Sequence, residues 1–187
     1  MTDELTQAQI REFVLAGHGD LGKVKALLAA EPRLLNARYQ EFDETALEAA
    51  AHVGNRTIAE YLLAQGAPLT ICAAAMLGQR VAVQGFLSAD SHLAHSSGAH
   101  GISLLYHAAQ SGDTAITDLL EAYGNTQDPS QPLHGAVNYG RTAMVRWLLA
   151  RGANIAVLNF QGQTPLQVAE ALGHEEIAAL LRQHEAG

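Results

Sequence analysis

The chain repeats one pattern of apolar and small residues from near its start to near its end. A short apolar run rich in small residues stops at a glycine, and a pair of apolar residues follows seven to nine positions later. Glycine tolerates the positive φ that ends a helix, and the apolar residues after it recur at helical spacing. Each copy therefore predicts two short antiparallel helices joined by a tight turn. The turn glycines of the six copies are Gly19, Gly54, Gly78, Gly112, Gly140 and Gly173.

A single hairpin of this kind leaves one apolar side uncovered, so neighbouring copies must stack to bury it. The chain holds 34 alanines and only 5% aromatic residues, which favours short helices packed closely together. No long run alternates apolar β-branched residues with polar ones, so we expect no large sheet. The pattern predicts an all-α solenoid.

Specific segments resemble the ankyrin repeat. Residues 162–169 read Gly-Gln-Thr-Pro-Leu-Gln-Val-Ala, similar to that family's opening Gly-x-Thr-Pro-Leu-His-x-Ala-Ala. Residues 148–153 read Leu-Leu-Ala-Arg-Gly-Ala, similar to its closing Leu-Leu-x-x-Gly-Ala. Partial matches occur at 45–47, 62–67 and 132–136, and the six glycines are spaced 35, 24, 34, 28 and 33 residues apart, around the family's period of about 33.

The resemblance covers about residues 9–184, and the first copy is similar to the opening units of small stand-alone bacterial ankyrin-repeat proteins. It implies an all-α ankyrin solenoid of about six helix–turn–helix units with short, partly missing β-hairpin fingers. We expect one domain over 1–187, whose first and last units act as caps. The expected units are 9–38, 39–68, 69–95, 96–127, 128–159 and 160–187.

One connection between units is too short for the usual finger. Gly78 follows Gly54 by only 24 residues, and Pro68 runs almost directly into the next expected helix. The unit at Gly140 is also short, whereas the connections 38–44 and 89–102 are full length or longer. The sequence therefore predicts a row of fingers with a gap above the inner helix that carries Cys72, Met76 and Leu77.

By resemblance, the fingers and inner helices line a concave face that binds other proteins. The family's variable inner-helix positions are the two residues before the turn glycine, and adaptable side chains occupy several of them here. Aromatic and charged finger tips are further anchors, although a ring there can instead pack against a neighbouring finger. The candidate partner-binding residues are Tyr39, Phe42, Glu44, His52, Met76, Leu77, His100, Gln110, Asn138, Tyr139 and Phe160.

The charge balance narrows the partner. The net charge is −8 and no basic patch is visible, which argues against nucleic acid. Acidic residues cluster over 41–48, so rim acids such as Asp43 and Glu44 would steer a basic segment, unless the run is a solvated loop. An acidic start without an apolar region, no apolar run near about 18 residues, and a single cysteine, Cys72, predict a cytoplasmic protein without a membrane span. We expect a monomer or weak oligomer.

A pocket beneath the missing finger is the alternative site. Glu48 and His52 are four residues apart on one helix face and could form a general base beside the Cys72 thiol. The same residues are also an ordinary helix pair and a buried small hydrophobe. No other catalytic motif accompanies them, so we expect a non-enzymatic interaction module. A closed pocket would favour a small molecule, and a long open groove a protein. The pocket lining would be Phe42, Glu48, His52, Cys72, Met76, His100 and Tyr106.

The histidines carry less chemistry than their number suggests. His92, His95, His100 and His107 lie close together in sequence, and His-x-x-His can ligate zinc. Asp90 is the only nearby acid, and His107 falls on an expected helix while the others fall on a loop. We therefore expect no metal and no cofactor. His134 occupies the histidine position of the repeat motif, where we expect it to make structural hydrogen bonds to backbone.

Overall fold

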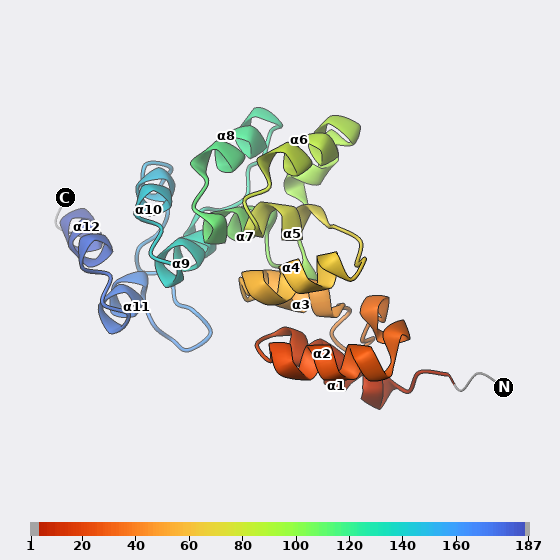
Figure 1. Ribbon diagram of the computed structural model, residues 1–187. Helices are drawn as coiled ribbons and strands as arrows, with labels where there is room; N and C mark the ends of the chain where they lie inside the picture. Colours follow the sequence, from red (N-terminus) through yellow and green to blue (C-terminus); the bar gives the residue numbers. More distant parts are fainter. Residues whose placement is uncertain (1–3, 186–187) are drawn as a thin grey trace.

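The chain folds into an arc of paired helices, as Figure 1 shows. The computed structural model describes residues 4–185, and that part holds twelve α-helices in six consecutive pairs and no strands. The expectation of an all-α solenoid is therefore confirmed. The helices are α1 (Gln7–Gly17), α2 (Leu21–Ala30), α3 (Ala46–His52), α4 (Arg56–Ala64), α5 (Ile71–Met76), α6 (Arg80–Ala89), α7 (Leu104–Ser111), α8 (Thr114–Ala122), α9 (Ser130–Asn138), α10 (Thr142–Leu149), α11 (Pro165–Ala171) and α12 (Glu175–Glu185).

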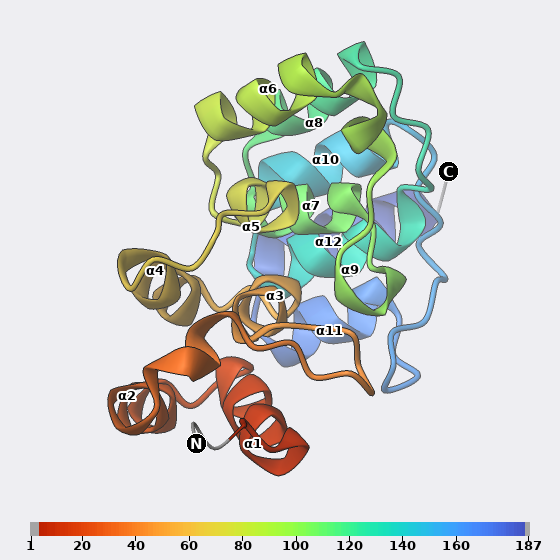
Figure 2. The ribbon, with the colours of Figure 1, turned by 90° about the vertical axis from the view of Figure 1, so that its right-hand side faces the viewer.

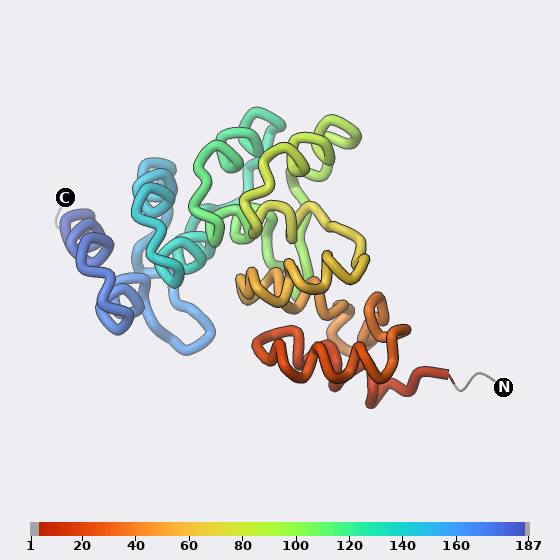
Figure 3. Tube along the Cα trace, in the orientation of Figure 1, coloured from red at the N-terminus to blue at the C-terminus, as the bar shows by residue number. Residues whose placement is uncertain are grey.

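The first helices of the pairs form one row and the second helices another. Along the first row, α1 contacts α3, and the contacts continue through α5, α7 and α9 to α11. Figure 2 shows α6, α8 and α10 as a second layer beside α5, α7 and α9, and the tube in Figure 3 shows the row curving from one terminus to the other. We call the first row the inner helices.

Local sequence sets where the inner helices begin. Thr45 and Thr164 each accept a hydrogen bond from the backbone three residues on, and the side chain at that position bonds back to the threonine N–H. This reciprocal capping satisfies amide groups that a helix start leaves without partners. The turn after α3 has its glycine, Gly54, at φ +69°, a conformation that other residues adopt only with strain. The glycine that the sequence pattern predicted at this turn is thus required by the positive φ of the backbone.

The connections between pairs have two lengths. Residues 37–45 and 96–103 each form a loop closed by one antiparallel bridge, Tyr39 with Glu44 and Ser97 with Ser103. Residues 153–164 form a third long loop. The connections 65–70 before α5 and 123–129 before α9 are short and carry no bridge. The predicted gap above α5 is therefore confirmed, because too few residues connect α4 to α5 to build a finger. Short 3₁₀ turns lie at Pro32–Asn36, Ser91–His95 and Ala99–Gly101.

Small residues let the inner helices approach closely. At the α1–α3 contact, a Cβ placed on Gly17 would lie 2.7 Å from the carbonyl oxygen of Ala46. Ala49, Ala73, Ala108 and Ala136 are fully buried between neighbouring helices. These small residues thus allow a short distance between the inner helices and bring the C-terminal end of α1 close to the start of α3. Within residues 4–185, no helix has both the length and the apolarity needed to cross a membrane.

Candidate functional site

The predicted partner-binding residues differ widely in exposure. Phe160 is fully exposed, at 101%, and Asn138, Tyr139 and His100 are also exposed. Phe42 and His52 are half-buried. Five residues that we expected on an accessible face are buried, which corrects that expectation: Tyr39, Glu44, Met76, Leu77 and Gln110.

The buried residues have different neighbours. Tyr39 lies in the apolar cluster of α1–α4, where its ring meets Phe42 edge-on at 5.1 Å between centroids. Met76 and Leu77 belong to the same apolar cluster, at the end of α5. The centroid of the Phe42 ring lies 5.8 Å from that of the His100 ring. This finger aromatic therefore packs against the next finger, which was the alternative considered for aromatic finger tips.

Six of the predicted residues line one concave hollow with a volume of about 490 Å³. They come from the ends of α3, α7 and α9 and from two fingers, so the curvature of the solenoid brings them together. Val53, Ile102 and Tyr106 complete the wall, and of these three only Ile102 was not expected there from the sequence. The six are His52, His100, Gln110, Asn138, Tyr139 and Phe160.

On the side of Tyr106 and Phe160, two further hollows adjoin this one. They have volumes of about 420 and 300 Å³, and both share Tyr106 and Phe160 with the first. Ile102 and Pro132 supply apolar surface in the second, beside Asp128. The three hollows together form a groove along the inner helices, which we call the concave groove.

Hydrogen bonds across the concave side join units that are far apart in sequence. The Gln110 amide donates to the backbone carbonyl of His52 at 2.8 Å, and the Tyr139 hydroxyl donates to the carbonyl of Val53. These carbonyls lie at the C-terminal end of α3, where a helix leaves acceptors without internal partners. Gln110 is buried because its side-chain amide makes this hydrogen bond. Neither its residue type nor its position in the repeat predicted this contact.

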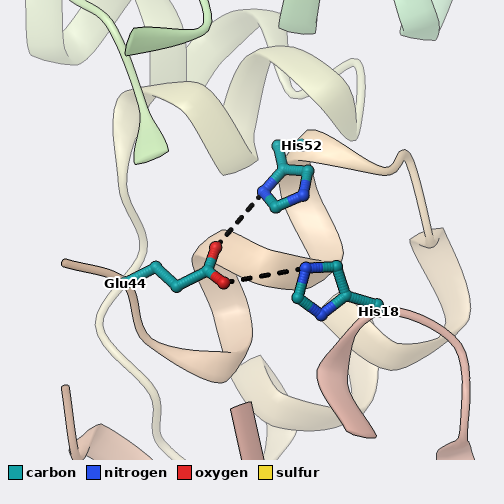
Figure 4. Close-up of side chains that lie close together, drawn as sticks. All are labelled: His18, Glu44 and His52. Atoms are coloured by element: carbon teal, nitrogen blue, oxygen red, sulfur yellow. Dashed lines mark ion pairs between the residues drawn. The ribbon is translucent and has the colours of Figure 1, made fainter. Parts of the chain in front are cut away.

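A buried carboxylate lies at the inner edge of this region. Glu44 has 0% exposure, and histidines from three elements surround it. Oε1 lies 3.6 Å from His18 Nε2, while Oε2 lies 3.3 Å from His52 Nδ1 and 3.4 Å from His100 Nε2. Figure 4 shows Glu44 between His18 and His52, with one carboxylate oxygen toward each ring. We call Glu44, His18, His52 and His100 the Glu44–histidine cluster.

The expectation that Glu44 is a rim acid is therefore wrong. The bridge to Tyr39 turns the Glu44 side chain inward, and its neighbour Asp43, with a side chain 86% exposed, occupies the rim instead. Both Glu44 oxygens and His52 Nδ1 are buried without a hydrogen-bond partner. A buried charge needs compensation, because removing it from water costs several kcal/mol.

Backbone strain accompanies the cluster. In residues 4–185 two residues other than glycine have positive φ, Asp43 at 48° and His100 at 57°. Asp43 directly precedes Glu44, and His100 is a member of the cluster. Such conformations cost about 1–3 kcal/mol each and concentrate at functional sites.

His18 is the cluster member that sequence reasoning missed as a site residue. It caps α1, immediately before Gly19, and its Nδ1 lies 3.3 Å from the Leu15 carbonyl. Only its place next to a turn glycine singled it out in the sequence. Within the described part of the chain, His18, Glu44 and His52 form the group of metal-ligand side chains whose ligand atoms all lie within 4.8 Å of one another.

The proposed Glu48–His52–Cys72 chemistry is corrected by the structure. Glu48 accepts two hydrogen bonds from Arg38 Nη2, at 2.8 and 2.9 Å, and caps Thr45, while His52 faces Glu44 instead. Cys72 is buried, and this burial raises the pKa of its thiol to about 12. A nucleophilic cysteine needs an accessible thiolate, so this arrangement does not supply one.

The other histidines behave differently from the cluster. His92 and His95 are exposed on a 3₁₀ turn, whereas His107 is buried on α7 and faces the Ser103 carbonyl at 2.9 Å. Burial lowers the pKa of His107 to about 4. His134 Nε2 lies 3.0 Å from the Val157 carbonyl, which confirms its expected structural hydrogen bond to backbone.

Family models agree with this architecture. A model described as ankyrin repeats (3 copies) matches residues 69–159 and 105–187, and a model of the single ankyrin repeat matches residues 42–84. Together they span more than half of the chain. The chain belongs to the ankyrin-repeat family, whose repeats are generic protein–protein interaction modules.

Curated relatives match over part of the chain. They include human "Transient receptor potential cation channel subfamily A member 1", 31% identical over 51% of this chain and 8% of its own length. The "Putative E3 ubiquitin-protein ligase XBAT35" of Arabidopsis thaliana is 37% identical over 35% of this chain and 14% of its own length. "Potassium channel AKT1" of the same plant is 34% identical over 41% of this chain and 10% of its own length. The matched region is thus a small part of each of these relatives.

Proposed function

We propose that this protein is a non-enzymatic interaction module that binds an extended segment of a partner protein in the concave groove. The observation that carries the proposal is the placement of Phe160. Its ring is fully exposed at a finger tip, and it borders all three adjoining hollows. A large exposed aromatic at the junction of a groove is a suitable anchor for a partner.

The groove offers apolar walls with polar groups at intervals. Tyr106, Ile102 and Tyr139 supply apolar surface, and the Asn138 and Gln131 amides offer hydrogen bonds to a peptide backbone. Such a mixture supports an extended chain whose side chains alternate between the groove and solvent. Met76 and Leu77 play no direct part in this proposal, because both are buried.

Charge favours a basic partner segment. Asp128 borders the groove and Asp43 lies exposed on the finger that precedes α3. With a net charge of −8, these acids would raise the association rate of a segment rich in lysine or arginine. The proposal also includes a cytoplasmic location, a monomeric or weakly oligomeric state, and a division into six units whose first and last act as caps.

Selection from a displayed library of short random peptides tests the proposal directly. We expect enriched peptides to combine an apolar anchor with basic residues. Phe160→Ala and Tyr106→Ala should each weaken binding of the selected peptides by about 2 kcal/mol, or roughly 30-fold in Kd. Val81→Ala is the matched control, because Val81 is 85% exposed on α6, outside the groove.

The opposite results would reject the proposal. Peptides whose binding is unchanged by Phe160→Ala and Tyr106→Ala would place the interaction on another surface. Failure to enrich any peptide, together with a small molecule that co-purifies with the wild type and is lost in Tyr106→Ala, would instead favour a small-ligand pocket.

A further inference from the structure

The Glu44–histidine cluster has the composition of a metal site. It brings together three imidazoles and one carboxylate. His18 lies at the end of α1, Glu44 in the loop before α3, His52 at the end of α3, and His100 in the finger before α7. Imidazole and carboxylate ligands suit Zn²⁺ and related divalent transition metals. We propose that His18, Glu44 and His52 bind one such ion, with Zn²⁺ as the representative, and that His100 lies at its open side. This inference is independent of the proposed peptide binding.

The distances between the ligand atoms fit an ion better than they fit hydrogen bonds. The N···O separations of 3.3, 3.4 and 3.6 Å exceed the usual limit of about 3.2 Å, and neither Glu44 oxygen has a hydrogen-bond partner. A tetrahedral Zn²⁺ with bonds of about 2.0–2.1 Å separates its ligand atoms by about 3.3–3.4 Å. The three N···O separations lie near this value, and the ligand atoms of His18, Glu44 and His52 all lie within 4.8 Å of one another.

The surroundings favour a cation. Glu44 brings a carboxyl group that is 0% exposed, and His18 and His52 lie at the C-terminal ends of α1 and α3, where the helix dipole is negative. The buried Nδ1 of His52 is aimed at the carboxylate without another partner. Together these features favour a cation bound at this position.

The supporting contacts orient one ligand correctly. The Nδ1 of His18 faces the Leu15 carbonyl at 3.3 Å, which places its Nε2 toward Glu44. In metal sites the second ring nitrogen commonly donates to such an acceptor and fixes the tautomer. An entry path is also present, because the side chains of His100 and His18 are 40% and 30% exposed while Glu44 is covered.

Zinc titration of the full chain tests the proposal. After treatment with a chelator, the protein is titrated with Zn²⁺ by calorimetry, and bound metal is measured after gel filtration. We expect one equivalent of Zn²⁺, a rise in Tm on binding, and no comparable binding of Mg²⁺ or Ca²⁺, which prefer sites built from oxygen ligands. Bound Co²⁺ should give the visible absorption of a low-coordinate site.

The variants identify the ligands. Glu44→Gln, His52→Gln and His18→Gln should each weaken Zn²⁺ binding by more than about 100-fold, since loss of an outer partner alone costs 10–100-fold. The double variant His92→Gln/His95→Gln is the matched control and should bind as the wild type does, because both residues are exposed and lie outside the cluster. Circular dichroism of each metal-free variant verifies folding, and the half-exposed His18 allows a test even where a buried substitution unfolds the chain.

Three results would overturn the proposal. Wild-type protein that takes up no Zn²⁺ at micromolar concentration would refute it. Binding that survives both Glu44→Gln and His18→Gln would also refute it. Binding that disappears in His92→Gln/His95→Gln would assign the ion to the 3₁₀ turn instead. None of these results depends on the peptide experiment.

Discussion

The hydroxyl of Tyr139 donates a hydrogen bond to the backbone carbonyl of Val53 across the concave side of the arc. Tyr139 follows α9 and Val53 follows α3, so this bond joins the second helix pair to the fifth. The ring also covers Gly54, where an added Cβ would lie 2.8 Å from the tyrosine Cε2. The contact therefore helps to set the curvature on which the concave groove depends.

Tyr139→Phe tests the contribution of this bond. We expect the free energy of unfolding to fall by about 1 kcal/mol, because the variant keeps the ring packing and loses one hydrogen bond. Urea denaturation followed by circular dichroism measures the change. An unchanged midpoint would show that water replaces the hydroxyl at Val53 without cost.

Gly54→Ala should be more destabilising than Tyr139→Phe. Alanine must adopt the left-handed φ of +69° at a cost of about 1–2 kcal/mol, and its methyl group meets the Tyr139 ring. In a Tyr139→Ala background only the backbone cost should remain, so a double-mutant cycle gives a coupling energy between the two positions. Equal costs of Gly54→Ala in both backgrounds would disprove the packing contact.

Replacement of glycine by alanine should have opposite effects on stability at two positions within helices. Gly17→Ala should destabilise the protein by about 1–3 kcal/mol, because the new Cβ would lie 2.7 Å from the Ala46 carbonyl oxygen and 3.1 Å from its Cα. Gly85→Ala on α6 should stabilise it by about 0.5–1 kcal/mol, since nothing lies within 4 Å of the new Cβ and alanine is the better helix former. Thermal unfolding of both variants checks the signs. A stabilising Gly17→Ala would mean that α1 and α3 can move apart freely.

Cys72 should be unreactive in the folded protein. Its thiol is buried and burial raises its pKa to about 12, so almost no accessible thiolate forms near neutral pH. We expect modification by a thiol-specific disulfide reagent to occur only as fast as the chain opens, and rapidly in denaturant. The rate measured against denaturant concentration tests this, and fast labelling of the native state would restore Cys72 as a candidate nucleophile.

His107 should make stability depend on pH. Burial holds its folded pKa at about 4, below the ordinary 6.5, so the unfolded chain binds more protons between these values. The contribution of His107 is therefore complete above pH 6.5 and is lost as pH falls toward 4, by roughly 3 kcal/mol at most.

Urea denaturation at several pH values compares wild type with His107→Gln. We expect a shallower loss of stability in the variant over this window. His92→Gln, at an exposed histidine, should retain the wild-type slope. Parallel curves for wild type and His107→Gln would show that His107 does not titrate differently in the two states.

Several features of this fold are local consequences of sequence. Thr45 and Thr164 start helices because their hydroxyls accept the first free amides, and Gly54 ends one turn because it accepts a positive φ. The missing finger before α5 follows from chain length alone, since six residues cannot both connect the helices and form a hairpin. Each of these effects acts within a few residues, so the order of residues specifies it.

The environment of the candidate residues depended on contacts between distant units. The sequence by itself determined the repeat, the helix pairs, the gap and the placement of Tyr139 and Phe160 on the concave side. Only the tertiary structure decided that Glu44 turns inward among His18, His52 and His100. The same is true of the hydrogen bond that the Gln110 amide donates to the His52 carbonyl. The reason is geometric: the curvature of a solenoid sums small rotations between neighbouring units, and contacts across its concave side depend on that sum rather than on any one repeat.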